Sequence, residues 1–118
     1  MTTLMTAAYS RSRTLRTMDH KYSAIQAHDG WKGQMDLITS EKLLENESPY
    51  VYILHQVDHQ LYISYVNKKN TVYHVAFILG SQGKHIYRNG WVITSDELED
   101  FIPLAMHTTK DSCQPFHH

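Results

Sequence analysis

Three short runs of strand-forming residues occupy the middle of this 118-residue chain. They span residues 50–56, 61–67 and 71–79, and each is rich in Val, Ile and Tyr, which favour extended structure. Only short polar segments separate them. The second such segment, residues 67–70, indicates a hairpin turn, because the asparagine at each of its ends tolerates a positive φ angle. The sequence therefore predicts a central antiparallel β-sheet.

Helical patterns stand on both sides of this sheet in the sequence. The first helix is expected to begin with Thr39 or Ser40 as its cap and to end before Pro49, because proline disfavours helical geometry in the preceding residue. The second is expected to open with a capping box at residues 94–97, where a Thr precedes a Glu by three positions. Two amphipathic helices can cover a half-apolar sheet. The predicted fold class is α+β, a central antiparallel β-sheet flanked by two α-helices.

Composition and length suit one domain with a core of its own. Hydrophobic residues make up 42% of the chain and charged residues 19%. We expect a polar, basic N-terminal arm over residues 1–30, a domain over 31–105 and a polar tail over 106–118. The basic, acid-free start also matches an organelle transit peptide, although an arm is the simpler interpretation. The expected core comprises Leu43, Leu44, Tyr52, Leu54, Ile63, Val75, Phe77, Leu98 and Phe101.

Net charge and cysteine content limit which partners the chain can attract and which cellular compartment suits it. The formal net charge is −1, which gives no general attraction to nucleic acid or to an anionic membrane. No apolar run approaches the length of about 20 residues that spans a bilayer. The single cysteine, Cys113, excludes an internal disulfide and suits a reducing compartment, so we expect a cytoplasmic protein.

A series of short motifs resembles a Src-homology-2 (SH2) domain over roughly residues 31–105. The segment Tyr52-Ile-Leu-His55 stands where that family usually has Phe-Leu-Val-Arg. The turn at residues 57–60 is shorter than the family's phosphate-cradling turn. The other similar segments, in order, are Trp31-Lys-Gly33, Glu41-Lys-Leu43-Leu44, Ile63-Ser64, Val72-Tyr-His74-Val-Ala-Phe77, Gly83-Lys-His-Ile86 and Ser95-Asp-Glu-Leu98.

The resemblance implies a phosphotyrosine-peptide-binding module, not an enzyme, with no cofactor or metal. Its partner would be a tyrosine-phosphorylated peptide or protein. His55 replaces the arginine that binds phosphate in the family, and a histidine lacks the guanidinium fork and is mostly neutral at pH 7. Binding is therefore expected to be weak or atypical. The implied phosphate-binding residues are His55, Gln56, His59, Ser64 and His74, and the implied peptide contacts are Val75 and Ile86 beside the loop at residues 80–83.

Two alternatives remain open. One is a degenerate SH2-like domain that mediates a phosphate-independent protein interaction. The remote one is a metal or acid–base site built from the nine histidines, although each histidine taken singly is more simply structural. The chain contains no zinc-protease, nucleophile-elbow or phosphate-loop motif. A stand-alone domain with a shortened turn is also similar to secreted bacterial effectors, for which the compartment would be the host cytosol.

Overall fold

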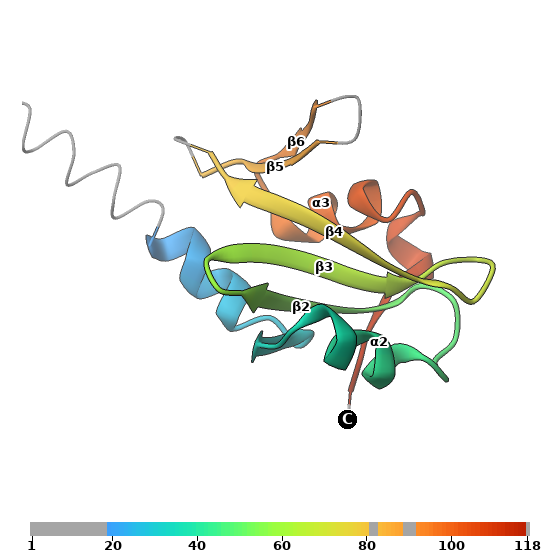
Figure 1. The fold of residues 1–118 in the computed structure, drawn as a ribbon. Helices are drawn as coiled ribbons and strands as arrows, with labels where there is room; N and C mark the ends of the chain where they lie inside the picture. The colour runs from blue at the N-terminus through green and yellow to red at the C-terminus, as the bar shows by residue number, and fades with distance from the viewer. Residues whose placement is uncertain (1–18, 81–82, 89–91, 118) are drawn as a thin grey trace, which may run out of the picture.

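The protein is described here by a computed structural model that covers residues 19–80, 83–88 and 92–117. Residues 19–26 are helical. The elements that follow are β1 (Trp31–Gln34), α2 (Leu37–Leu44), β2 (Val51–Val57), β3 (Gln60–Val66), β4 (Val72–Leu79), β5 (His85–Arg88), β6 (Val92–Ser95), α3 (Leu98–Ala105), the 3₁₀ turn η1 (Lys110–Ser112) and β7 (Gln114–Pro115). Figure 1 shows the long β4 lying between β3 and the smaller β5–β6 hairpin. The predicted α+β class is confirmed.

The strands form one open, mostly antiparallel sheet of seven strands. Its order is β1-β2-β3-β4-β5-β6, and β7 pairs with β2. The three predicted strands are its centre, with Leu54 opposite Ile63 and Ile63 opposite Val75. β1 and β7 run parallel to β2, which the sequence did not predict. β4 pairs with β5 only through residues 77–79. Among the described strands, residues 72–76 therefore pair with β3 on one edge and with no strand on the other.

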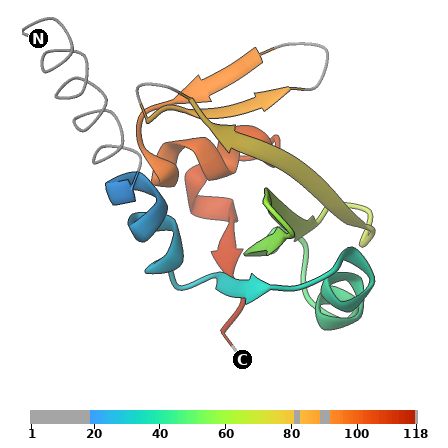
Figure 2. The ribbon, with the colours of Figure 1, turned by 60° about the vertical axis from the view of Figure 1, so that its left-hand side comes forward.

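Alternate residues of β2 enter two different apolar clusters, because successive side chains of a strand point to opposite faces. Leu54 packs with Phe101 of α3 in the larger cluster, and Ile53 packs with Leu44 of α2 in the smaller one. Figure 2 shows α2 and α3 on either side of the central strands. The predicted core residues are buried except Leu43, which is half-buried against the smaller cluster.

Both predicted helix starts are wrong in detail. Asp36 is the N-cap of α2, and its side chain accepts a hydrogen bond of 2.7 Å from the Thr39 N–H. Thr94, expected to open the second helix, lies instead in β6 opposite Ile86, and α3 begins at Leu98. The pairing of β6 with β5 determines the conformation at Thr94 in spite of the local capping signal.

The packed structure extends beyond residues 31–105 at both ends. Ile25, from the segment expected to be an arm, is fully buried in the larger cluster. Phe116, from the segment expected to be a tail, is buried in the smaller cluster, and β7 just before it pairs with β2. The arginine-rich residues 11–16, which suggested a transit peptide, lie outside the described residues. No helix in the described ranges is long and apolar enough to cross a membrane.

Candidate functional site

His55 stands in a chain of hydrogen bonds that runs across the sheet from Met35, the residue after β1, to α2. Its Nδ1 lies 2.8 Å from the carbonyl oxygen of Met35, and its Nε2 lies 2.6 Å from Ser64 Oγ on β3. Ser64 Oγ is also 2.6 Å from Nδ1 of His74 on β4. His74 Nε2 is 2.9 Å from a carboxylate oxygen of Glu41 on α2. Three of the five implied phosphate-binding residues are therefore in direct contact, on the α2 face.

Counting hydrogens shows how many protons this chain of contacts can use. The four contacts need one hydrogen each, whereas neutral His55, Ser64 and neutral His74 supply three between them. The Met35 carbonyl and the Glu41 carboxylate can only accept. The chain is therefore fully bonded only when it holds one further proton. Burial lowers the pKa of His55, so its imidazole stays neutral.

His55 and Ser64 are both completely buried. The Tyr62 ring stacks on the His55 ring with the centroids 5.7 Å apart and covers one face of the imidazole. Because both ring nitrogens of His55 already have partners, no ring atom is left to contact a ligand. The same burial removes Ser64 as an accessible nucleophile. His74, with 15% of its side chain exposed, and Glu41, with 55% exposed, bring the chain to the surface.

The pocket lined by Met35, whose carbonyl is the partner of His55, is acidic. It has a volume of about 380 Å³ and lies between β1, the start of α2 and the β2–β3 turn. Asp36 and Asp58 line it, together with Gln34, Met35, Thr39, Gln56 and Val57. None of these lining residues is a lysine, arginine or histidine. A phosphate carrying up to two negative charges would meet two carboxylates here and no cation.

Gln56 and His59 do not join the His55 chain. Gln56 follows His55 in β2 and points to the other face, where its side-chain oxygen accepts a hydrogen bond from the Tyr22 hydroxyl. Its amide nitrogen donates to the Asp58 carbonyl at 2.8 Å. His59 is exposed at the tip of a two-residue turn, in which Asp58 has a φ of 54°. This turn is too short to curl over a ligand.

The two implied peptide contacts lie on opposite faces of the sheet. Val75 is buried in the larger cluster under α3. Ile86 pairs with Ile78, which has the opposite orientation to Val75 along β4. Ile78 is 48% exposed, so this pair forms an apolar strip on the α2 side of the sheet. Of the loop at residues 80–83, Ser81 and Gln82 lie outside the described residues.

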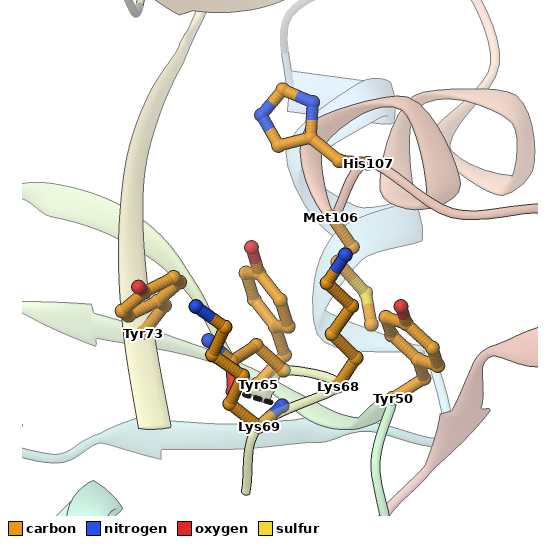
Figure 3. A pocket seen from close by; sticks show the side chains of 8 residues that line it. Tyr50, Tyr65, Lys68, Lys69, Tyr73, Met106 and His107 are labelled. Atoms are coloured by element: carbon orange, nitrogen blue, oxygen red, sulfur yellow. Dashed lines mark hydrogen bonds between the residues drawn. The ribbon is translucent and has the colours of Figure 1, made fainter. Parts of the chain in front are cut away.

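A second pocket, which the sequence analysis missed, lies on the opposite face. Its volume is about 310 Å³, and it is lined by Tyr50, Tyr65, Asn67, Lys68, Lys69, Tyr73, Met106 and His107. Figure 3 shows the two lysines rising from the β3–β4 turn among three tyrosine rings, with His107 across the opening. A signal was present in the sequence, because two lysines occupy a predicted turn with Tyr65 before it and Tyr73 after it.

Comparison with known proteins adds no family. No family model matches the chain, and no curated protein matches its sequence. Within the described ranges, no three His, Cys, Asp or Glu side chains are grouped so that they could hold a metal ion.

Proposed function

We propose that the chain is a degenerate SH2-like module that binds an extended peptide without requiring phosphotyrosine. The order of its elements, with a central antiparallel sheet and helices α2 and α3 on its two faces, supports the resemblance found in the sequence motifs. The position of His55 on the α2 face of β2 agrees with the same resemblance.

One observation favours the phosphate-independent form of that module. His55 is fully buried, neutral and bonded through both ring nitrogens, so it offers no charge and no free donor. The adjacent pocket presents the carboxylates of Asp36 and Asp58. Phosphate binding needs fixed donors and positive charge, and this arrangement supplies neither.

A peptide would bind along the part of β4 that has a free edge. Residues 72–76 have a free edge among the described strands, and an extended peptide can add to such an edge through backbone hydrogen bonds. The exposed Ile78 continues an apolar surface on one side of this edge, and Tyr73, half-exposed, stands on the other. Peptide side chains would alternate between these two faces.

Paired peptides test this proposal directly. A panel of tyrosine-containing peptides, each made with and without phosphate, is titrated against the protein while fluorescence anisotropy is recorded. We expect the affinities of each peptide with and without phosphate to agree within about twofold. We expect Ala76→Pro to abolish binding, because proline removes a backbone donor and disrupts the edge strand. Binding that appears only with the phosphorylated peptides would contradict the proposal.

Phosphotyrosine binding remains the second candidate, and the surface end of the histidine chain favours it. Glu41 already places an anionic oxygen on Nε2 of His74, and an incoming phosphate could replace that oxygen. In that case Glu41→Gln should raise affinity for a phosphorylated peptide by about tenfold, because a competing negative charge is removed. Equal affinities of the two proteins would leave the first proposal as the better one.

A further inference from the structure

We propose that the pocket lined by Lys68, Lys69 and His107 receives an acidic side chain, Asp or Glu, of an unphosphorylated partner peptide. We name it the lysine–tyrosine pocket. This inference rests on the proposed function, because the same peptide would lie along the free edge of β4. It adds the chemical class of the partner and a binding site on the face opposite His55.

The charges at this pocket have one sign. Lys68 and Lys69 are exposed at its rim, His107 is exposed on its other side, and none of the described residues that line it is acidic. The formal net charge of the whole chain is −1, so this is a local concentration of positive charge on a slightly acidic protein. Such a site attracts carboxylates and disfavours cationic peptides.

The β3–β4 turn fixes where the lysine backbones stand. The Asn67 side-chain oxygen accepts hydrogen bonds from the N–H groups of Lys69 and Thr71, both at 2.9 Å. Asn70 takes a φ of 62°, which asparagine tolerates in a tight turn. The two lysine stems therefore leave a closed hairpin tip and rise beside the tyrosine rings, as Figure 3 shows.

The floor of the pocket is largely apolar and buried. Met106 and Tyr65 are buried at its base, and the rings of Tyr65 and Tyr73 meet edge to face with centroids 6.0 Å apart. The methylene stem of a glutamate, or an apolar neighbour of an aspartate, can pack on such a surface while the carboxylate reaches the ammonium groups. Burial raises the pKa of Tyr65, so its hydroxyl remains protonated and able to donate.

Backbone strain also gathers at this pocket. His107 follows α3 with a φ of 56°, and its neighbour Thr108 donates to the Pro103 carbonyl at 3.0 Å, which makes a Schellman ending. Glycine is the usual residue at that position because it has no Cβ. Tyr50 has a φ of 69°, which is a clear outlier for an aromatic residue. Residues kept in such conformations at one site point to a functional role there.

The pocket continues from the free edge of β4. Tyr73 belongs to residues 72–76, the part of β4 with a free edge, and its side chain lines the pocket. A peptide strand paired with this stretch would direct every second side chain toward the same face. Those side chains would lie on the same face as Tyr73 and the lysine–tyrosine pocket.

A carboxylate fits this arrangement better than a phosphate. Tight phosphate sites use arginine forks or converging backbone N–H groups, whereas lysines act as point charges on flexible stems. Both lysines here are exposed at a hairpin tip. A single negative charge on a short stem is enough for such a site.

Selection from a random peptide library displayed on phage tests the inference. The full chain is used as bait, once with the untreated library and once after treatment of the library with a tyrosine kinase. Affinities of the selected peptides are then measured for the unchanged protein, for Lys68→Glu/Lys69→Glu and for the control Lys42→Glu/Lys84→Glu. The control makes the same charge change at exposed lysines outside the pocket. Circular dichroism verifies that both variants are folded.

We expect the peptides selected from the untreated library to be enriched in Asp and Glu. The pocket variant should bind them at least about tenfold more weakly than the unchanged protein does, whereas the affinity of the control variant should stay within about twofold. Replacement of the peptide's acidic residue by its amide should cause a similar loss. Binders without acidic enrichment, or equally weakened by both variants, would overturn the inference and leave the peptide-binding function standing. Binders found only after kinase treatment, or none at all, would overturn both.

Discussion

The contacts of His55 show what a histidine does at the position where the resemblance implies an arginine. An arginine there would bring a permanent charge and five donors, most of which would need an external anion. The imidazole of His55 needs two partners, and Met35 and Ser64 supply them from within the protein. The result is a closed internal link that joins β2 and β3 to Met35, the residue after β1. Its physical role is to hold strands together, independently of any ligand.

Removal of that link should destabilise the protein without affecting peptide binding. His55→Ala removes the side-chain partner of the Met35 carbonyl, leaves Ser64 Oγ with His74 alone and opens a cavity. We expect a loss of about 3 kcal/mol in the free energy of unfolding, measured by urea denaturation. His59→Ala, at the exposed turn, is the control and should change it by less than about 0.5 kcal/mol. A small effect at His55 would show that the hydrogen-bond chain contributes little.

The buried histidines should also make stability depend on pH. Burial lowers the pKa values of His55 and His85 below their ordinary value of 6.5. Below about pH 6.5 the unfolded chain therefore binds protons that the folded chain does not, so stability falls with falling pH until the folded-state pKa values are reached. The limiting slope is about 1.4 kcal/mol per pH unit for each group.

Urea midpoints between pH 5 and 7.5 measure this effect. The midpoint should rise with pH up to about 6.5 and then level off. His55→Ala should reduce the slope, because it removes one of the two buried groups, whereas His59→Ala should leave the slope as it is. A midpoint that is constant over this range would mean that both buried histidines titrate as they do in the unfolded chain.

At the scale of elements, the ending of α3 combines strain with its place beside the lysine–tyrosine pocket. His107 occupies a position where glycine would relieve the steric conflict of a left-handed backbone. His107→Gly should therefore stabilise the protein by up to about 1 kcal/mol and, by removing the imidazole N–H donor from the pocket, weaken acidic-peptide binding. Thr109→Gly is the control, since Thr109 has an ordinary φ of −93° and glycine there should destabilise. If His107→Gly and Thr109→Gly shift the melting temperature equally, the backbone at His107 is not strained.

Local sequence predicted those elements whose structure is determined locally. The three central strands followed from their Val, Ile and Tyr content, and the turn at Asn67 followed from side-chain chemistry that acts within four residues. The start of α3 was missed because Thr94 pairs across the sheet with Ile86. β7 was missed because a two-residue strand has no pattern of its own and exists only through its pairing with Val51 and Tyr52.

The candidate sites divide in the same way. The resemblance brought His55 and His74 to one face, and the Ser64 hydroxyl between them follows from the strand register. It could not reveal that Glu41 binds His74, because that contact depends on the rotation of α2 over the sheet. The lysine–tyrosine pocket also lies outside the resemblance. It joins the β3–β4 turn to the end of α3, segments that only the tertiary fold brings together.

At the scale of the whole molecule, the ends of the described chain complete the core. The helix at residues 19–26 places Ile25 in the larger cluster, and its Tyr22 hydroxyl donates to the side chain of Gln56. From the other end, Phe116 enters the smaller cluster, where Lys32 lies over its ring with Nζ 5.0 Å from the centroid. The two clusters are therefore each sealed by a segment that local sequence indicated to be peripheral.

Truncation to residues 31–105 should consequently prevent folding. It removes Ile25, Met106 and Phe116, each at most 4% exposed, together with the pairing of β7. The loss of a large buried apolar side chain costs about 2–5 kcal/mol, so three such losses approach the roughly 5–15 kcal/mol that stabilises a typical domain. We expect the 31–105 fragment to give a collapsed amide ¹⁵N–¹H spectrum and no cooperative thermal transition. Residues 19–117 retain these contacts and should give a dispersed spectrum. A folded 31–105 fragment would mean that the terminal segments pack on a core that is already sufficient without them.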